Sequence, residues 1–390
     1  MNKQIGLSVL AVAAMIFFPG CGNNSGSPTV KIGLIAEISG QIPAVGASCR
    51  NAALLSVKQI NDAGGIDLGG KKYLIQLLVE DSASKADQAA VVTQKLITQD
   101  NVLAIIGPNS SGNALPASEI AEQSKTVLIT PWSTNPKTTI NAKTGTPKKY
   151  VFRACFTDIF EGRVMGKFCH DTLKAQKAAV LFDVATEVFK SQAELFRKSF
   201  EAAGGKVVGF ETYTTGDKDF SSQLTKIRNA GPDVIFSPSY YTDVSLQVQQ
   251  ARRLGIKVPF VGSDGWSTPE LIKMCGKDCE GFYFCNHYSA DSENPATRDF
   301  VAAYKAAYGT TPDDVAALTW DAFGLLWQAL AKSGSIDDRE MLRQRLSEGQ
   351  SYKGVTGSIV FLANSGDPVK GAVIMRIKDG KFVWSSDSQP

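Results

Sequence analysis

The sequence predicts an α/β protein made of two lobes, each built around a parallel sheet. Short apolar runs alternate with longer segments of helical periodicity from Val30 onward, and this alternation restarts after residues 150–158. The chain from Cys21 onward has about 370 residues, which is too long for one compact core. Strands and helices that alternate in this way form a parallel sheet with helices on both faces.

The first α/β unit occupies the N-terminal part of the chain. Its predicted strands span residues 30–35, 73–79, 102–106 and 127–130, and its predicted helices span residues 47–60, 88–96 and 117–123. Gly64 and Gly65 end the first helix, because glycine readily adopts the left-handed conformation of a helix C-terminus.

The second unit repeats this layout and is followed by further helices. Its predicted strands span residues 178–182, 207–213, 234–237 and 259–262, and its helices span residues 192–203, 224–230 and 246–254. Helices then follow at 296–308, 315–332 and 339–348, and strands at 357–361, 372–378 and 381–384. The late helices need an apolar surface to pack on, which a return of the chain to the first unit would provide.

The N-terminus resembles a bacterial lipoprotein signal. Lys3 precedes an apolar stretch at residues 5–18, which is too short to span a bilayer comfortably, and Gly20-Cys21 leads into a polar segment. The resemblance implies that Cys21 becomes the acylated first residue of an exported protein, anchored by lipid in the periplasm or at the cell surface. The alternative is ordinary signal cleavage with an incidental Cys21.

Composition and motifs argue against nucleic-acid binding and catalysis. Removing Lys3 from the 41 basic residues leaves 40 against 38 acidic ones, so no basic excess is available for nucleic acid. Only two histidines exist, His170 and His287, and the sequence has no nucleophile elbow, dinucleotide fingerprint or phosphate-binding loop. We therefore expect no enzyme activity, no cofactor and no metal site.

Cysteine usage agrees with export. Six cysteines remain besides Cys21, and an even number in an exported chain suits disulfides. The spacing of Cys275, Cys279 and Cys285 is not that of a zinc site. Cys275 and Cys279 are the first candidates for a disulfide, although the sequence leaves the pairing open.

Two loops that follow predicted strands of the first unit carry hydroxyl groups. Residues 107–112 include Ser110 and Ser111 at a helix N-terminus, where hydroxyls and N–H groups suit a carboxylate, although plain helix capping explains the serines equally well. In the next loop, Ser133 and Thr134 could complete a polar cage with Trp132 as an apolar wall. A buried structural tryptophan is the alternative for Trp132.

Two loops of the second unit offer aromatic and acidic side chains. Tyr240 and Tyr241 follow the strand at 234–237, and such residues provide amphipathic contact surface or pack in the core. Asp264 follows the strand at 259–262, where a ligand ammonium or simple turn formation would explain it. Ligands bind beyond the carboxyl ends of parallel strands, so two facing sheets would form a cleft lined by these loops.

Several motifs make the chain similar to the type I periplasmic binding proteins, and in particular to the branched-chain amino acid binding proteins of ABC importers. The motifs are Lys31-Ile32-Gly33-Leu34-Ile35, the Asn61-Asp62-Ala63-Gly64-Gly65 turn, Gly107-Pro108, Gly216-Asp217-Lys218-Asp219-Phe220-Ser221 and Ala251-Arg252-Arg253-Leu254-Gly255. The resemblance extends from about residue 30 to residue 384. It implies two Rossmann-like lobes with parallel central sheets, joined by a multi-strand hinge.

The resemblance also implies domain boundaries. A signal peptide at residues 1–21 and a polar tether at 22–29 precede the lobes. Lobe 1 is expected to contain residues 30–155 and 287–363, and lobe 2 residues 156–286 and 364–390.

The roles of the loop residues follow from the same resemblance. Ser111, with Ser110 beside it, matches the serine that holds a ligand carboxylate, and Thr134 matches a threonine that contacts both carboxylate and ammonium. The remaining implied contacts are backbone groups of Trp132 and Ser133, the ammonium-binding pair Tyr240 and Asp264, and Asp158 near the crossover between lobes.

Two positions depart from the family pattern. Val45 stands where many relatives have a tyrosine, and Glu187-Val188 falls where another tyrosine is usual. Two side-chain walls of the pocket therefore differ from the usual ones. The resemblance implies a small amino acid ligand, branched-chain or otherwise aliphatic, which is passed to a membrane permease. The alternative is a sensor of the same fold that binds an amide, in which case Asp264 would lack an ammonium partner.

Overall fold

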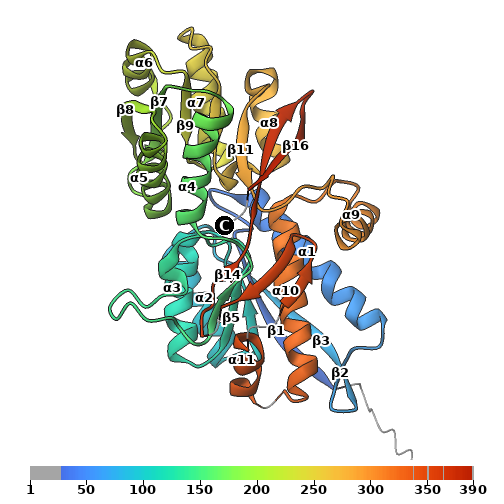
Figure 1. The fold of residues 1–390 in the computed structure, drawn as a ribbon. Coiled ribbons are helices and arrows are strands. Elements are labelled where there is room, and N and C mark those ends of the chain that lie inside the picture. The colour runs from blue at the N-terminus through green and yellow to red at the C-terminus, as the bar shows by residue number, and fades with distance from the viewer. Residues whose placement is uncertain (1–27, 337, 349–350, 363, 389–390) are drawn as a thin grey trace, which may run out of the picture.

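The computed structural model describes residues 28–336, 338–348, 351–362 and 364–388. It shows two α/β lobes, one above the other in Figure 1, which confirms the predicted fold class. Cys21, the predicted signal peptide and most of the predicted tether lie outside the described residues. None of the described helices is long and apolar enough to cross a membrane.

Lobe 1 contains a six-stranded sheet in the order β2-β3-β1-β4-β5-β6. Its strands are β1 (Thr29–Ala36), β2 (Ile66–Leu68), β3 (Lys71–Asp81), β4 (Ala104–Ile106), β5 (Val127–Thr130) and β6 (Val151–Arg153), with helices α1 (Pro43–Asp62), α2 (Ala86–Thr98) and α3 (Ser111–Gln123). All pairings except β2 with β3 are parallel. Leu34 and Ile35 are neighbours on β1 but belong to different core clusters, so both faces of the sheet are buried.

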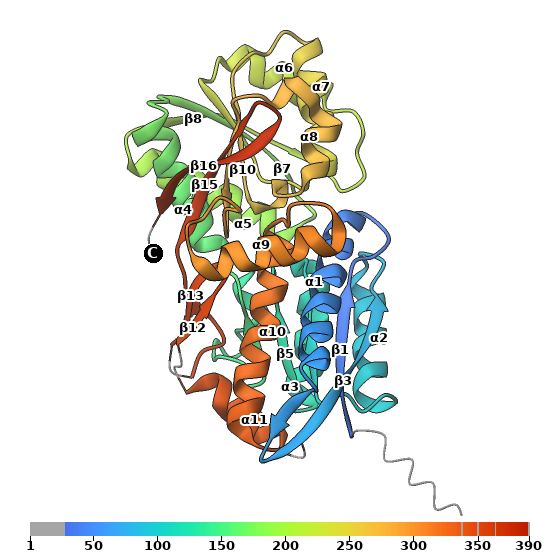
Figure 2. The ribbon, with the colours of Figure 1, turned by 90° about the vertical axis from the view of Figure 1, so that its right-hand side faces the viewer.

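The C-terminal third of the chain returns to lobe 1. It contributes α9 (Pro295–Tyr308), α10 (Asp314–Ser333), α11 (Arg339–Ser347) and a small antiparallel sheet of β12 (Ser351–Gly354), β13 (Gly357–Phe361) and β14 (Pro368–Val369). Helix α10 packs against α1, where the Trp327 indole donates to the Ser56 hydroxyl at 3.0 Å. Figure 2 shows α10 running alongside α1.

Lobe 2 contains a seven-stranded sheet in the order β16-β15-β11-β10-β9-β7-β8. Its strands are β7 (Lys177–Asp183), β8 (Lys206–Tyr213), β9 (Val234–Ser237), β10 (Phe260–Gly262), β11 (Tyr283–Asn286), β15 (Ala372–Lys378) and β16 (Lys381–Ser388). Its helices are α4 (Asp158–Lys167), α5 (Glu187–Ala202), α6 (Ser221–Ala230), α7 (Tyr241–Arg253) and α8 (Pro269–Cys275). Short helical turns of lobe 2 are η2 (Phe168–Thr172), η3 (Asp264–Trp266) and η4 (Gly276–Cys279). A further short turn, η1 (Pro136–Thr138), belongs to lobe 1. Strands β15 and β16 are antiparallel and close one edge.

Three segments connect the lobes, at residues 154–157, 287–294 and 370–371. The resemblance implies that the last change of lobe occurs at residue 364. Strand β14 still pairs with β13 of lobe 1, however, so the chain leaves that lobe only after Val369. The sequence could not show this, because a two-residue strand has no periodicity to detect.

The predicted disulfide candidates lie next to each other as free thiols. The structure describes six cysteines, all unpaired, and Cys275 and Cys279 are hydrogen-bonded neighbours at the junction of α8 and η4. Their proximity shows that bond formation would need little movement. We expect air-oxidised protein to give one peptide pair linked through Cys275 and Cys279 in mass spectrometry under non-reducing conditions. Two alkylated thiols at these positions in oxidised protein would contradict this pairing.

Candidate functional site

The eight predicted ligand-contacting residues gather where the two lobes face each other. They come from the carboxyl ends of β4 and β5 in lobe 1, from those of β9 and β10 in lobe 2, and from the first crossover. Each is at most 8% exposed: Ser110, Ser111, Trp132, Ser133, Thr134, Asp158, Tyr240 and Asp264. The Trp132 and Tyr240 rings, from opposite lobes, lie 6.2 Å apart between centroids. The lobes are therefore closed over these residues.

Glu37, at the end of β1, occupies the N-terminus of α3. This buried carboxylate accepts hydrogen bonds from the backbone N–H groups of Asn109 and Ser110, from the Ser110 hydroxyl at 2.9 Å, and from the amides of Asn109 and Asn113. We predicted that successive N–H groups of this loop would serve a ligand carboxylate. The first two, those of Asn109 and Ser110 just before the helix, instead bind an internal carboxylate. The Ser110 hydroxyl is likewise engaged by Glu37.

The hydroxyl groups of the two lobe 1 loops form a connected network. The Ser133 hydroxyl lies 3.2 Å from that of Ser111 and 2.7 Å from that of Thr138, and the Asn135 N–H donates to Ser111 Oγ at 3.3 Å. The Thr134 hydroxyl has no hydrogen-bond partner in the described part of the chain. The Thr134 carbonyl accepts a hydrogen bond from the Asp158 N–H at 3.0 Å. The Thr134 hydroxyl is thus available to a ligand.

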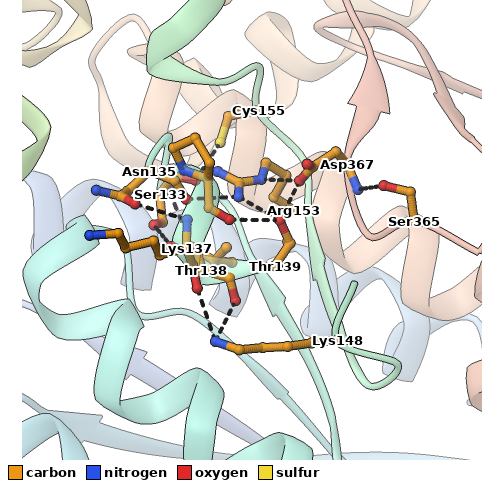
Figure 3. Close-up of polar contacts among 12 residues, drawn as sticks. Ser133, Asn135, Lys137, Thr138, Thr139, Lys148, Arg153, Cys155, Ser365 and Asp367 are labelled. Atoms are coloured by element: carbon orange, nitrogen blue, oxygen red, sulfur yellow. Dashed lines mark hydrogen bonds and ion pairs between the residues drawn. The ribbon is translucent and has the colours of Figure 1, made fainter. Parts of the chain in front are cut away.

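Arg153, on β6, holds the loop after β5 in place (Figure 3). Its guanidinium donates to the carbonyls of Ser133 and Asn135, to the Thr139 hydroxyl and to the Asp367 carboxylate, the last at 2.6 Å. The Arg153 side chain is fully buried. Carbonyl acceptors at fixed positions suit the rigid fork of an arginine, so this residue makes the ligand-facing loop a preorganised structure.

The lobe 2 side of the site combines aromatic rings with a buried carboxylate. The Phe189 ring meets Tyr240 edge to face at a centroid distance of 4.8 Å. Gly265 allows the loop after β10 to approach the loop after β9, because a Cβ at this position would lie 2.5 Å from the Ser239 carbonyl oxygen. Tyr240 and Asp264 are brought together by this close approach.

Asp264 is held from two directions. Its Oδ2 lies 3.0 Å from Nε2 of His287, and its N–H donates to the Glu161 carboxylate at 2.7 Å. No described residue hydrogen-bonds Oδ1, so this oxygen is free to receive a ligand cation. Burial, followed by the charge of Asp264, raises the pKa of Glu161 well above its usual range.

Asp158, at the start of α4, is completely buried and neither of its carboxyl oxygens has a hydrogen-bond partner with acceptable geometry among the described residues. Burial raises the pKa of Asp158 to about 7, and the charge of Arg153 and the nearby Ser191 hydroxyl oppose this shift only in part. A buried carboxylate without a partner is costly. Together with its backbone contact to Thr134, this makes Asp158 a second acidic group available to a ligand.

Asp314, the first residue of α10, connects the two lobes. Its carboxylate accepts the Trp132 indole N–H at 3.1 Å and the hydroxyl of Ser267, which belongs to lobe 2. Lys137 of lobe 1 and Glu187 of lobe 2 form an ion pair between the lobes. The Asp314–Ser267 and Lys137–Glu187 contacts cross from one lobe to the other, so separation of the lobes would break them.

Sequence reasoning missed five residues of this site: Glu37, Arg153, Glu161, His287 and Asp314. Each acts from outside the four strand-end loops, so loop composition gave no signal for it. Glu161 alone had a usable cue, since it lies three residues after Asp158 and therefore on the same helical face.

Comparison with known proteins identifies relatives that share this fold. Residues 29–381 match the family model of a periplasmic binding protein. The chain is 28% identical to a leucine-, isoleucine-, valine-, threonine- and alanine-binding protein of Pseudomonas aeruginosa, over 90% of each chain. A branched-chain amino acid transporter substrate-binding protein from Streptococcus pneumoniae, solved with isoleucine, superposes with a TM-score of 0.85 at 32% identity, covering 93% of this chain and 100% of the other. A solute-binding protein of an ABC transporter from R. palustris, solved with benzoate, gives a TM-score of 0.82 at 25% identity, over 93% and 97%.

Proposed function

Because the chain belongs to the type I periplasmic binding proteins, in the branched-chain amino acid family, we propose that it binds a small aliphatic amino acid between its lobes and delivers it to an ABC importer. Ligand capture in this family is binding without chemistry, so the site needs complementary groups and no catalytic ones. The further proposal that Cys21 anchors the protein to a membrane by lipid rests on the sequence pattern alone.

One arrangement carries the proposal: the loops that hold lobe 1 hydroxyls and a free carboxylate oxygen of lobe 2 meet where the lobes close. The hydroxyls of Ser111 and Thr134 suit a ligand carboxylate, and Oδ1 of Asp264 suits an ammonium. These two groups of an α-amino acid lie on the same carbon, so such a ligand contacts both lobes at once. It would thereby favour the closed arrangement over the open one.

Aromatic and aliphatic side chains support an apolar ligand side chain. Trp132, Tyr240 and Phe189 are buried in one hydrophobic cluster, together with Val45 and Val188. These include the two positions that depart from the family pattern. Walls of this chemistry would accept a branched or linear aliphatic group and reject a charged one.

A ligand without an ammonium is the second candidate, and Asp158 supports it. With a pKa of about 7, this carboxyl can be protonated at neutral pH and can then donate a hydrogen bond to an amide or carboxylate oxygen. The benzoate complex of the R. palustris relative is consistent with such ligands in this fold. A sensor for amides or aromatic acids would use the same cleft.

A thermal-shift screen distinguishes the two candidates. A ligand that binds only the folded protein raises its stability by RT ln(1 + [L]/Kd). We expect isoleucine, leucine or valine to raise the melting temperature, and propionamide and benzoate to leave it unchanged. A shift with propionamide or benzoate alone would replace the amino-acid proposal by the second candidate.

Ser111→Ala should weaken isoleucine binding only moderately. A hydrogen bond to a charged group contributes about 1.5–3 kcal/mol, and because the hydroxyl is one donor among several we expect the lower end, roughly tenfold in affinity. Calorimetric titration measures this, with Ser118→Ala as a control, because Ser118 is a buried serine of the same helix that bonds Leu115 and Lys148. A loss above about 100-fold would mean that Ser111 is the main anchor.

A further inference from the structure

His287 lies at the start of the second crossover and directly contacts the proposed ammonium site. Its Nε2 is 3.0 Å from Oδ2 of Asp264, and both side chains are almost completely buried. The ring also stacks on Phe156 of the first crossover, with centroids 3.7 Å apart and planes at 30°. The third crossover contributes Lys370, whose charge acts on the same ring. His287 therefore belongs to the second crossover, interacts with a residue of each of the other two, and hydrogen-bonds the carboxylate that is proposed to bind the ligand ammonium.

The hydrogen bonds define which nitrogen carries the proton. Within the described residues Nδ1 has no partner, so the ring of the closed form is best satisfied as the neutral tautomer that donates from Nε2 to Asp264. Burial lowers the pKa of His287, and Asp264 only partly opposes this shift. The charged groups that face the ring are Asp264 on η3 and Lys370 on the third crossover, and Glu161 of α4 faces Asp264 from its other side.

We infer that His287 is a positioning residue that fixes Asp264 for the ligand ammonium and makes ligand affinity fall as the pH becomes acidic. An imidazolium would place a second cation on the carboxylate that the ammonium needs, and its new Nδ1–H would be buried without an acceptor. Opening of the lobes exposes the ring to water, which restores a more ordinary pKa, so acid favours the open form. A cavity of about 840 Å³ lies beside the hinge and is lined in part by His287, Lys370 and Trp384, but the His287 side chain itself is fully buried. The inference rests on the proposed function, because it assumes a cationic group at Asp264.

The first measurement needs no ligand. The chain has only two histidines, and His170 lies at the surface beside Asp171, so its ring is an internal reference. Long-range ¹H–¹⁵N spectra of ¹⁵N-histidine-labelled protein at about pH 7.5 should show His287 as a neutral ring protonated on Nε2. A ring protonated on Nδ1, or charged at this pH, would overturn the inference.

The second measurement uses isoleucine as the probe. When ligand binding is coupled to the protonation of one group, the affinity changes by up to about tenfold for each pH unit below the pKa of that group. We expect the calorimetric Kd of the wild type to rise about tenfold or more between about pH 7.5 and 5.5. His287→Gln keeps an N–H donor for Asp264 and should bind within about threefold of the wild type at the higher pH, with a smaller pH dependence that comes from Asp158, whose pKa is about 7. His287→Phe keeps the stacking on Phe156 but has no donor, so it should bind more weakly at every pH.

The pH role, the positioning role and the proposed function each have a result that would count against them. A wild-type Kd that is flat with pH, or a His287→Gln variant with the wild-type slope, would refute the pH role. Equal affinity of the Phe variant at the higher pH would refute the positioning role. Failure of isoleucine to bind at any pH would count against the proposed function, whereas the tautomer measurement would still decide whether His287 serves Asp264.

Discussion

Asp264→Asn is expected to reduce isoleucine affinity by roughly 100-fold or more. Removing one partner of a buried charge pair costs about 3–5 kcal/mol, because the other charge remains buried and uncompensated. Asparagine has the shape of aspartate, and its carbonyl oxygen can still accept from His287, so the substitution removes the charge and little else. The affinity is measured by calorimetric titration at about pH 7.5, where His287 is expected to be neutral.

The folded protein should tolerate this change without loss of stability. Burial raises the pKa of both Glu161 and Asp158, and the charge of Asp264 adds to both shifts, so the ligand-free site carries some repulsion that asparagine relieves. Thermal unfolding of the ligand-free variant should therefore occur at the wild-type temperature or above. Asp171→Asn is the matched control, since it removes one negative charge from a half-exposed position of lobe 2. An affinity of Asp264→Asn within about threefold of the wild type would refute the ammonium assignment.

Arg153→Met is expected to destabilise the protein by about 3–5 kcal/mol and to weaken ligand binding as well. The variant leaves the carbonyls of Ser133 and Asn135 and the carboxylate of Asp367 without their buried donor. The loop that carries Trp132 and Thr134 would then lose its fixed geometry. Urea unfolding measures the stability, and isoleucine titration at low temperature measures the binding.

Asp367→Asn separates the two parts of this expectation. Asp367 is partly exposed and accepts a hydrogen bond from Nε of Arg153. The two terminal nitrogens of Arg153 donate to the loop carbonyls instead. Asp367→Asn should therefore cost less stability than Arg153→Met and leave isoleucine binding nearly unchanged. If Arg153→Met binds isoleucine as tightly as the wild type, the loop does not depend on the arginine for its conformation.

The sequence by itself determined the alternation of strands and helices, because this pattern depends on local periodicity. Strand β9 and strands β13 and β15 occur at their predicted bounds, and the helix predicted at residues 315–332 is α10 (Asp314–Ser333). The three-residue strand β6 and helix α4 were not predicted. A segment as short as Val151–Arg153 has too few residues for periodicity, and α4 begins with the buried acids Asp158 and Glu161 on an otherwise weakly amphipathic helix.

The four loops of the site were also readable, since polar side chains after buried strands mark the edge where ligands bind. Only the tertiary structure decided what each group is free to do. Glu37 takes the Ser110 N–H in the loop that we expect to serve a ligand carboxylate, and His287 takes one oxygen of Asp264. The first contact joins residues 73 positions apart in the chain, and the second joins residues 23 positions apart. Hydrogen bonds across such separations depend on how the sheets and crossovers pack, and local sequence carries no record of them.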